Sequence, residues 1–161
     1  MLIERHTIVQ SLSEWAEREG GRLAYAFLVQ GDVEERLTFA ELEARARALG
    51  GTLQRAGAAG ERVALLFPPG IDFIVAFFGC LYAGAVAVPA LPPRRRGGDP
   101  RLQAIFRDAR PRVALTSADK LPALESAAAG MPEWAATLLA DWHSAAAASR
   151  YPSGRSAESR P

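Results

Sequence analysis

Residues 62–88 read RVALLFPPGIDFIVAFFGCLYAGAVAV, and the succession of apolar runs and turn residues in this stretch predicts the fold class. Arg62 to Phe67 is a continuous apolar run of the kind that forms a strand buried on both faces of a parallel sheet. Ile71 to Ala83 is apolar nearly all round, as expected of a deeply buried helix, and Gly84 ends it. Ala85 to Val88 then reads as a second buried strand. This order predicts a βαβ unit, and therefore an α/β fold with a parallel sheet.

The rest of the chain up to residue 140 continues the alternation of helices and strands. Thr7 with Gln10, and Thr38 with Glu41, have the spacing of a capping box, in which each side chain satisfies an unpaired amide of the first helical turn. Before the βαβ unit, the sequence predicts a helix over residues 7–19, strands over 23–29 and 34–37, and a helix from residue 38 to about 57. After it, the sequence predicts a helix capped by Asp99, a strand over 112–116, a helix opened by Ser117 and closed by Gly130, and a short strand within 134–140.

The composition changes after Leu139. No Leu, Ile, Val, Phe or Met follows that residue, and residues 141–161 consist mainly of Ala, Ser, Arg and Pro. Such a segment cannot bury enough apolar surface to offset its ordering entropy, so we expect residues 1–140 to form the N-terminal part of a domain and residues 141–161 to be disordered. An out-of-frame reading of a GC-rich gene gives similar residue types, and we expect a frameshift or a truncated reading frame near residues 141–150. A natural domain boundary is the alternative, although boundaries seldom cut through a sheet domain.

Composition and charge are those of an ordinary globular protein. The 161 residues are 49% hydrophobic and 23% charged, with a net charge of +1, so the overall charge does not predict nucleic-acid binding. The single cysteine, Cys80, lies in an apolar run and has no cysteine partner for a disulfide or a zinc site. We see no signal-peptide pattern, and Asp72, glycines and prolines interrupt the longest apolar stretch. We therefore expect a cytoplasmic protein without a membrane span.

The sequence contains no recognisable catalytic or phosphate-binding motif. Neither G-x-G-x-x-G nor G-x-x-x-x-G-K-[ST] is present after a strand. Residues 67–70, Phe-Pro-Pro-Gly, occupy the place of such a loop, but the two prolines lack the amides that would hold a phosphate. Arg94 to Arg96 is a run that usually lies in a solvated loop, and His6 and His143 have no acid or nucleophile pattern around them. From the residues alone we predict no catalytic, cofactor-binding or metal-ligating residue.

Longer strings resemble the adenylate-forming superfamily, which includes acyl-CoA synthetases, peptide-synthetase adenylation domains and luciferases. LTFAEL at residues 37–42 resembles its first core motif, and LYAGAVAVP at residues 81–89 resembles its second. Within the superfamily, FPPGIDF at 67–73 and VPALPPR at 88–94 resemble the fatty acyl-AMP ligase branch. The resemblance covers roughly residues 37–124.

The resemblance implies an acetyl-CoA-synthetase-like fold, in which a large N-terminal adenylation domain precedes a small mobile domain. Such enzymes join a fatty acid to ATP, usually with magnesium, release pyrophosphate and pass the acyl group to the phosphopantetheine thiol of an acyl carrier protein, often in polyketide or lipopeptide biosynthesis. The family's phosphate loop with its lysine, its adenine-binding strand and its later acidic residues and lysine have no counterpart here, and Lys120 lies near no glycine-rich loop. We therefore expect part of a fatty acyl-AMP ligase that binds neither ATP nor magnesium by itself and needs the missing remainder of the adenylation domain.

Two loops are candidates for substrate binding, because open α/β sheets place ligands at the carboxyl ends of their strands. One contains Phe67, Pro68 and Pro69, and the other contains Pro89 and Pro92. We expect both to form part of the acyl-pocket wall, with purely structural turns as the alternative.

Two other functions remain open: a non-catalytic module that binds an acyl chain or a partner protein, and part of an acyl-CoA synthetase. A separate module should have polar residues on the surface where the rest of the domain would pack. An incomplete domain should expose a large apolar patch there.

Overall fold

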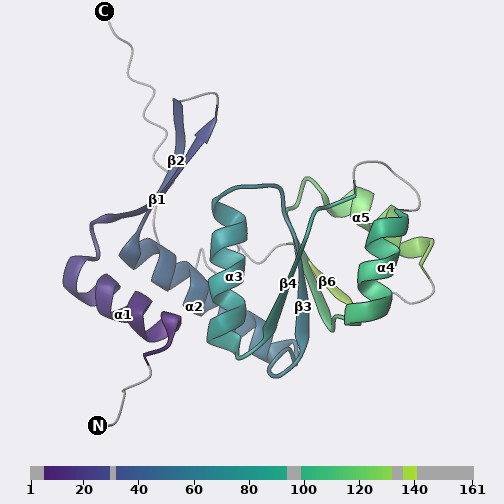
Figure 1. The fold of residues 1–161 in the computed structure, drawn as a ribbon, viewed down its shortest axis with the longest axis horizontal. Coiled ribbons are helices and arrows are strands. Elements are labelled where there is room, and N and C mark those ends of the chain that lie inside the picture. The colour runs from purple at the N-terminus through teal and green to yellow at the C-terminus, as the bar shows by residue number, and fades with distance from the viewer. Residues whose placement is uncertain (1–5, 30–31, 94–98, 132–135, 141–161) are drawn as a thin grey trace, which may run out of the picture.

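The computed structural model describes residues 6–29, 32–93, 99–131 and 136–140, and it confirms the predicted α/β fold (Figure 1). The elements in chain order are α1 (Ile8–Glu19), β1 (Leu23–Val29), β2 (Asp32–Thr38), α2 (Phe39–Arg55), β3 (Arg62–Leu66), α3 (Ile71–Ala83), β4 (Val86–Ala90), α4 (Pro100–Ala109), β5 (Val113–Thr116), α5 (Leu121–Ala129) and β6 (Thr137–Leu139). The tail that we expect to be disordered, Arg94 to Arg96 and His143 all lie outside the described residues.

The strands form two separate sheets. Four parallel strands have the order β4-β3-β5-β6, with Val63 of β3 paired to Ala87 of β4 on one side and to Val113 of β5 on the other. β1 and β2 form a two-stranded antiparallel hairpin. Figure 1 shows this hairpin projecting away from the parallel sheet.

Helices cover both faces of the parallel sheet. Alternate residues of a strand point to opposite faces, and β3 divides its side chains between two buried clusters. Val63 and Leu65 pack in the cluster that contains residues of α1, α2 and α3. Ala64 and Leu66 pack in the cluster formed with α4 and α5. The result is a three-layer arrangement, with α3 on one side of the sheet and α4 on the other (Figure 1).

α2 and α3 lie with their backbones in close contact because each presents a glycine to the other. A Cβ atom added at Gly79 would lie 2.7 Å from Leu49 Cδ2, and one added at Gly50 would lie 2.8 Å from Tyr82 Cβ. Leu49 itself is fully buried. These two glycines therefore set how closely the two helices approach.

Both predicted capping boxes are present. At α2, the Glu41 amide donates to Thr38 Oγ1 at 3.3 Å, and the Thr38 amide donates to Glu41 Oε2 at 2.8 Å. Thr7 and Gln10 form the same pair of bonds at α1. Leu37 and Leu42, on either side of the α2 cap, are both buried and clamp the entry of that helix.

Three predicted elements differ from the structure. β4 is not buried on both faces, since it is an edge strand with β3 as its partner among the described strands, and Val86 is 55% exposed. α5 begins at Leu121 instead of Ser117, because the Ser117 hydroxyl donates to Asp119 Oδ1 at 2.6 Å and does not cap the helix. β2 is longer than predicted and covers Asp32–Thr38. In the described part of the chain, no helix is long and apolar enough to cross a membrane.

Candidate functional site

The carboxyl ends of β3 and β4 bring the two candidate loops to the same edge of the sheet. Leu66, the last residue of β3, pairs with Ala90, the last residue of β4, so the chain leaves both strands at the same level. Phe67 is buried, with 2% of its surface exposed, and packs in the core with α3. Pro68 is exposed and Pro92 is half-buried. The two loops are therefore neighbours, as predicted, but Phe67 is mainly a core residue.

Pro89 lies inside a strand and not in a loop after one. β4 continues to Ala90, and Pro89 pairs in register with Leu65 of β3. The prediction that this strand ends at Val88 is therefore wrong. A proline fits here because β4 is an edge strand, where the missing amide can face away from β3 without breaking a hydrogen bond of the ladder.

Hydrogen bonds hold the neighbouring backbone in place. The fully buried Thr116 donates its hydroxyl to the Leu66 carbonyl at 2.9 Å, which ties the carboxyl ends of β5 and β3 together. Arg101 donates from Nη2 to the Leu91 carbonyl at 2.8 Å. Burial alone raises the pKa of the Asp99 carboxyl, but hydrogen bonds from the Leu102 amide and from Arg101 outweigh it and hold that pKa below its usual value. The second loop is thus anchored to the start of α4.

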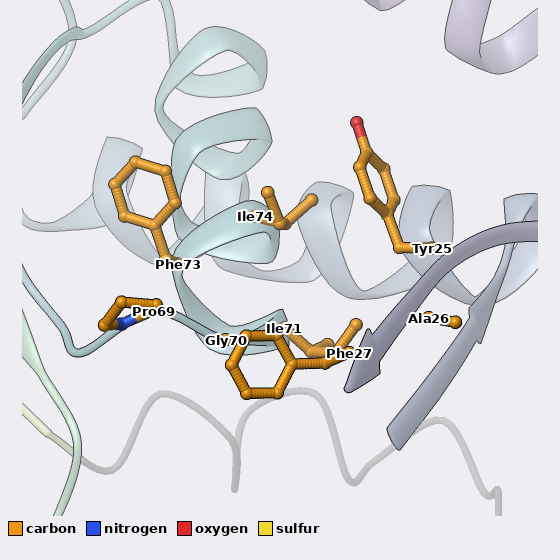
Figure 2. Close-up of a pocket in the computed structure, with 8 residues that line it drawn as sticks. All are labelled: Tyr25, Ala26, Phe27, Pro69, Gly70, Ile71, Phe73 and Ile74. Carbon is orange, nitrogen blue, oxygen red and sulfur yellow. The ribbon is translucent and has the colours of Figure 1, made fainter. Parts of the chain in front are cut away.

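An open apolar groove of about 240 Å³ lies beside the first loop (Figure 2). Tyr25, Ala26 and Phe27 of β1 form one wall, and Pro69 with the first turn of α3, including Ile71, forms the other. Figure 2 shows the ring of Phe27 beside Gly70 and Ile71. Apart from the Tyr25 hydroxyl, the lining side chains offer no polar group, so the groove suits an apolar occupant.

Of the five candidate residues, Pro69 lines this groove, and the structure places Phe67, Pro68, Pro89 and Pro92 outside its lining. Sequence reasoning missed the wall formed by β1. A signal was available, because residues 23–29 read LAYAFLV, which is entirely apolar, whereas a strand of a solvent-facing hairpin normally alternates apolar and polar residues.

The described titratable residues form no catalytic constellation. Burial raises the pKa of the Cys80 thiol to about 12, so this thiol is an inert core group. His6 and Lys120 lie at the surface, with His6 Nδ1 3.3 Å from Glu14 Oε1 and Lys120 Nζ 2.7 Å from Asp119 Oδ2. In the described ranges, no group of three or more His, Cys, Asp or Glu residues could hold a metal ion.

The comparison with known proteins decides the family. The sequence matches the family described as AMP-binding enzyme over residues 12–159. The chain belongs to the AMP-binding enzyme family. Its relatives include the medium-chain-fatty-acid–[acyl-carrier-protein] ligase JamA of Moorena producens, which is 42% identical over 76% of this chain and 21% of the relative. The long-chain-fatty-acid–AMP ligase FadD32 of Mycobacterium marinum is 38% identical over 72% of this chain and 19% of the relative.

Solved structures of AMP-binding enzymes share the fold. The fatty acid AMP ligase of Legionella pneumophila superimposes with a TM-score of 0.73 at 30% identity, covering 88% of this chain and 24% of that one. This agreement confirms the fold class and places the described elements in the N-terminal portion of an adenylate-forming enzyme. The chain spans about a fifth of the length of the two curated relatives, at 21% and 19%.

Proposed function

We propose that this chain is the N-terminal part of the adenylation domain of a fatty acyl-AMP ligase. The whole enzyme would activate a fatty acid with ATP in the cytoplasm and pass the acyl group to the phosphopantetheine thiol of a carrier protein. The observation that carries the proposal is the 42% identity to a ligase whose name specifies a fatty acid and an acyl carrier protein. The carrier protein, rather than coenzyme A, is favoured as the acceptor because that name, FadD32 and the Legionella enzyme all point to the acyl-AMP ligase branch.

The described residues of this chain do not fit ATP or magnesium. The loop after β3 contains Pro68 and Pro69, which have no amide to donate to a phosphate. The described acidic residues do not gather into a metal-binding group. Under the proposal, both ligands are held by parts of the ligase that lie outside the described residues, and this chain supplies scaffold.

The proposed substrate contribution is a part of the acyl-pocket wall at the carboxyl edge of the sheet. Pro68, Pro69 and Pro92 are the candidates, because they leave neighbouring strands at the same edge and at least part of each side chain is accessible. Phe67 would support this wall from the core, and Pro89 would do so from within β4.

A separate binding module is less well supported than part of a larger domain. Such a module should present polar residues where the rest of the domain packs. Instead, Leu23, Leu28 and Val86 are 45%, 55% and 55% exposed, with Leu91 at 47%. These exposed apolar side chains on β1, on β4 and directly after β4 favour part of a larger domain over a module with a polar surface.

A chimeric enzyme tests the proposal. Residues 1–140 would replace the matching segment of the Moorena producens ligase, and fatty-acid-dependent exchange of pyrophosphate into ATP would be measured with octanoate. We expect the chimera to be active, and the remainder of that ligase without any N-terminal segment to be inactive. A folded chimera that shows no octanoate-dependent exchange would overturn the proposal.

A further inference from the structure

The strand β1 exposes more apolar surface than a solvent-facing hairpin should. Leu23, Tyr25 and Leu28 are 45%, 40% and 55% exposed, respectively. In its partner β2, the exposed residues among the described side chains are the charged Glu35 and Arg36. A two-stranded hairpin is marginally stable in water by itself. We therefore expect another polypeptide segment or a ligand to cover the apolar strand β1.

The groove lies along the edge of β1 that faces away from β2. Tyr25, Ala26 and Phe27 are consecutive, and all three line the groove, although consecutive side chains of a strand point to opposite faces. The pairing with β2 is regular across these three residues, so the alternation holds there. None of the described side chains of β2 contributes to the lining. The groove therefore follows the backbone edge of the strand and not one of its faces.

Residues 23–29 lack the side chains that usually protect an edge strand, and the pairing with β2 is irregular only between Leu23 and Tyr25 and between Phe27 and Leu28. In the described part of the chain, β1 pairs only with β2, so its other edge presents backbone N–H and C=O groups without a strand partner. Exposed edges are normally blocked by lysine, proline or an inward-pointing charge, and residues 23–29 contain none of these. The edge of β4, in contrast, carries Pro89.

A polypeptide strand fits this groove better than a fatty acid does. An added strand can use the row of backbone donors and acceptors and place alternate apolar side chains in the groove, whereas an acyl chain can use only the apolar lining. The volume of about 240 Å³ is below the roughly 300–1,000 Å³ that is typical of small-molecule pockets. It is enough for one or two apolar side chains.

We propose that the free edge of β1 is a strand-docking site, occupied by an extended apolar segment from the remainder of the same ligase. This inference rests on the proposed function. In the Legionella structure the matched part is 24% of the chain, so most of that ligase lies outside the matched part and can supply such a segment. The docked segment would form a third strand beside β1 and insert an apolar side chain between Phe27 and Ile71.

Hydrogen exchange measured on two proteins tests the docking site. In the 161-residue chain alone, the β1 amides that point away from β2 should exchange quickly. In the chimera with the remainder of the Moorena producens ligase, they should exchange more slowly by at least about tenfold, because the third strand protects the edge. Equal exchange of β1 in the two folded proteins would show that the edge stays uncovered and would overturn the inference.

A matched pair of substitutions makes the test specific. Ala26→Lys places a long charged side chain at the groove, and Ala44→Lys makes the same change on the exposed surface of α2. Ala26→Lys should remove the added protection in the chimera, and Ala44→Lys should retain it. Unchanged protection with Ala26→Lys would count against the docking site. Circular dichroism of the substituted 161-residue chain shows whether the hairpin still folds.

Other occupants give different results in the same experiment. Protection of β1 that rises with the concentration of the chain alone would identify a second copy as the occupant. Protection of β1 on addition of octanoate would identify a fatty acid. Either result would overturn the inference. Failure of the proposed function is separable, because a folded chimera with protected β1 amides and no pyrophosphate exchange would refute only the activity.

Discussion

At the scale of single residues, neighbouring glycines of α2 differ in what surrounds them. A Cβ at Gly50 would lie 2.8 Å from Tyr82 Cβ and 3.3 Å from the Gly79 carbonyl oxygen, whereas a Cβ at Gly51 would meet only the Arg55 side chain at 3.5 Å. We predict that Gly50→Ala lowers the free energy of unfolding by about 1–3 kcal/mol through overpacking. Gly51→Ala should raise it by roughly 0.5–1 kcal/mol through helix propensity.

Urea unfolding followed by tryptophan fluorescence measures both changes. The pair controls for helix propensity, since the same substitution is made one position apart in one helix. If Gly50→Ala stabilised the protein as much as Gly51→Ala, the close approach of α2 and α3 would be disproved.

Cys80 gives a prediction of pH dependence. Burial raises the pKa of its thiol from 9.0 to about 12. Below pH 9 the thiol is protonated in both the folded and the unfolded state, and the free energy of unfolding is unaffected. Between pH 9 and 12 only the unfolded state loses the proton, so the stability falls with a slope of up to about 1.4 kcal/mol per pH unit.

The comparison with Cys80→Ala isolates this contribution. The substituted protein is expected to be less stable at pH 8 because of the smaller side chain, but to lose less stability between pH 9 and 11. Urea unfolding at each pH gives both slopes. Parallel slopes for the two proteins would show that the thiol does not carry this dependence.

At the scale of elements, the two capping boxes are chemically alike but differ in their surroundings. Thr38 is half-buried and follows the core residue Leu37, whereas Thr7 is exposed. We predict that Thr38→Ala lowers the free energy of global unfolding by about 1 kcal/mol, within the usual range for caps. Thr7→Ala should mainly speed hydrogen exchange in the first turn of α1 and leave the global value nearly unchanged. An equal loss in the free energy of global unfolding for Thr38→Ala and Thr7→Ala would contradict this prediction.

Sequence patterns predicted the positions of the helices and strands well, but they predicted the burial and the order of the strands less well. α3 was predicted with its observed bounds, because an apolar run closed by Gly84 leaves little freedom, and Gly84 adopts the left-handed φ of 70° that favours glycine. β4 was expected to be buried, since a run such as AVAV reads alike at the centre or the edge of a sheet. Strand order depends on contacts distant in sequence, which no local pattern contains.

In the candidate site, too, some features could be predicted from the sequence and others could not. The neighbouring positions of the loops after β3 and β4 followed from the rule that parallel strands end at one edge. The groove wall formed by β1 could not be predicted from the sequence. It depends on how the hairpin packs beside the start of α3, some 45 residues later along the chain. Whether Pro68, Pro69 and Pro92 contact an acyl chain stays a prediction.

At the scale of the whole molecule, we predict no activity for the chain alone. Purified chain should show no fatty-acid-dependent exchange of pyrophosphate into ATP, because Pro68 and Pro69 leave the loop after β3 without the amides that would hold a phosphate. The measurement needs the Moorena producens ligase as a positive control. Exchange above background that depends on added octanoate would disprove both this expectation and the proposed placement of the ATP site.

The contact between α2 and α3 also bears on the order in which the molecule folds. The segment from Phe39 to Ala83 contains two helices and the strand between them, and it leaves the ribosome before α4 and β5 do. This segment is suited to be the folding nucleus. We therefore expect Gly79→Ala, which disturbs it, to slow refolding in stopped-flow experiments, and Leu124→Ala in α5 to act mainly by speeding unfolding. A nascent chain stalled at the length where residue 83 has just emerged from the ribosome would already hold the packed helix pair and β3, the strand beside which β4 and β5 are then added.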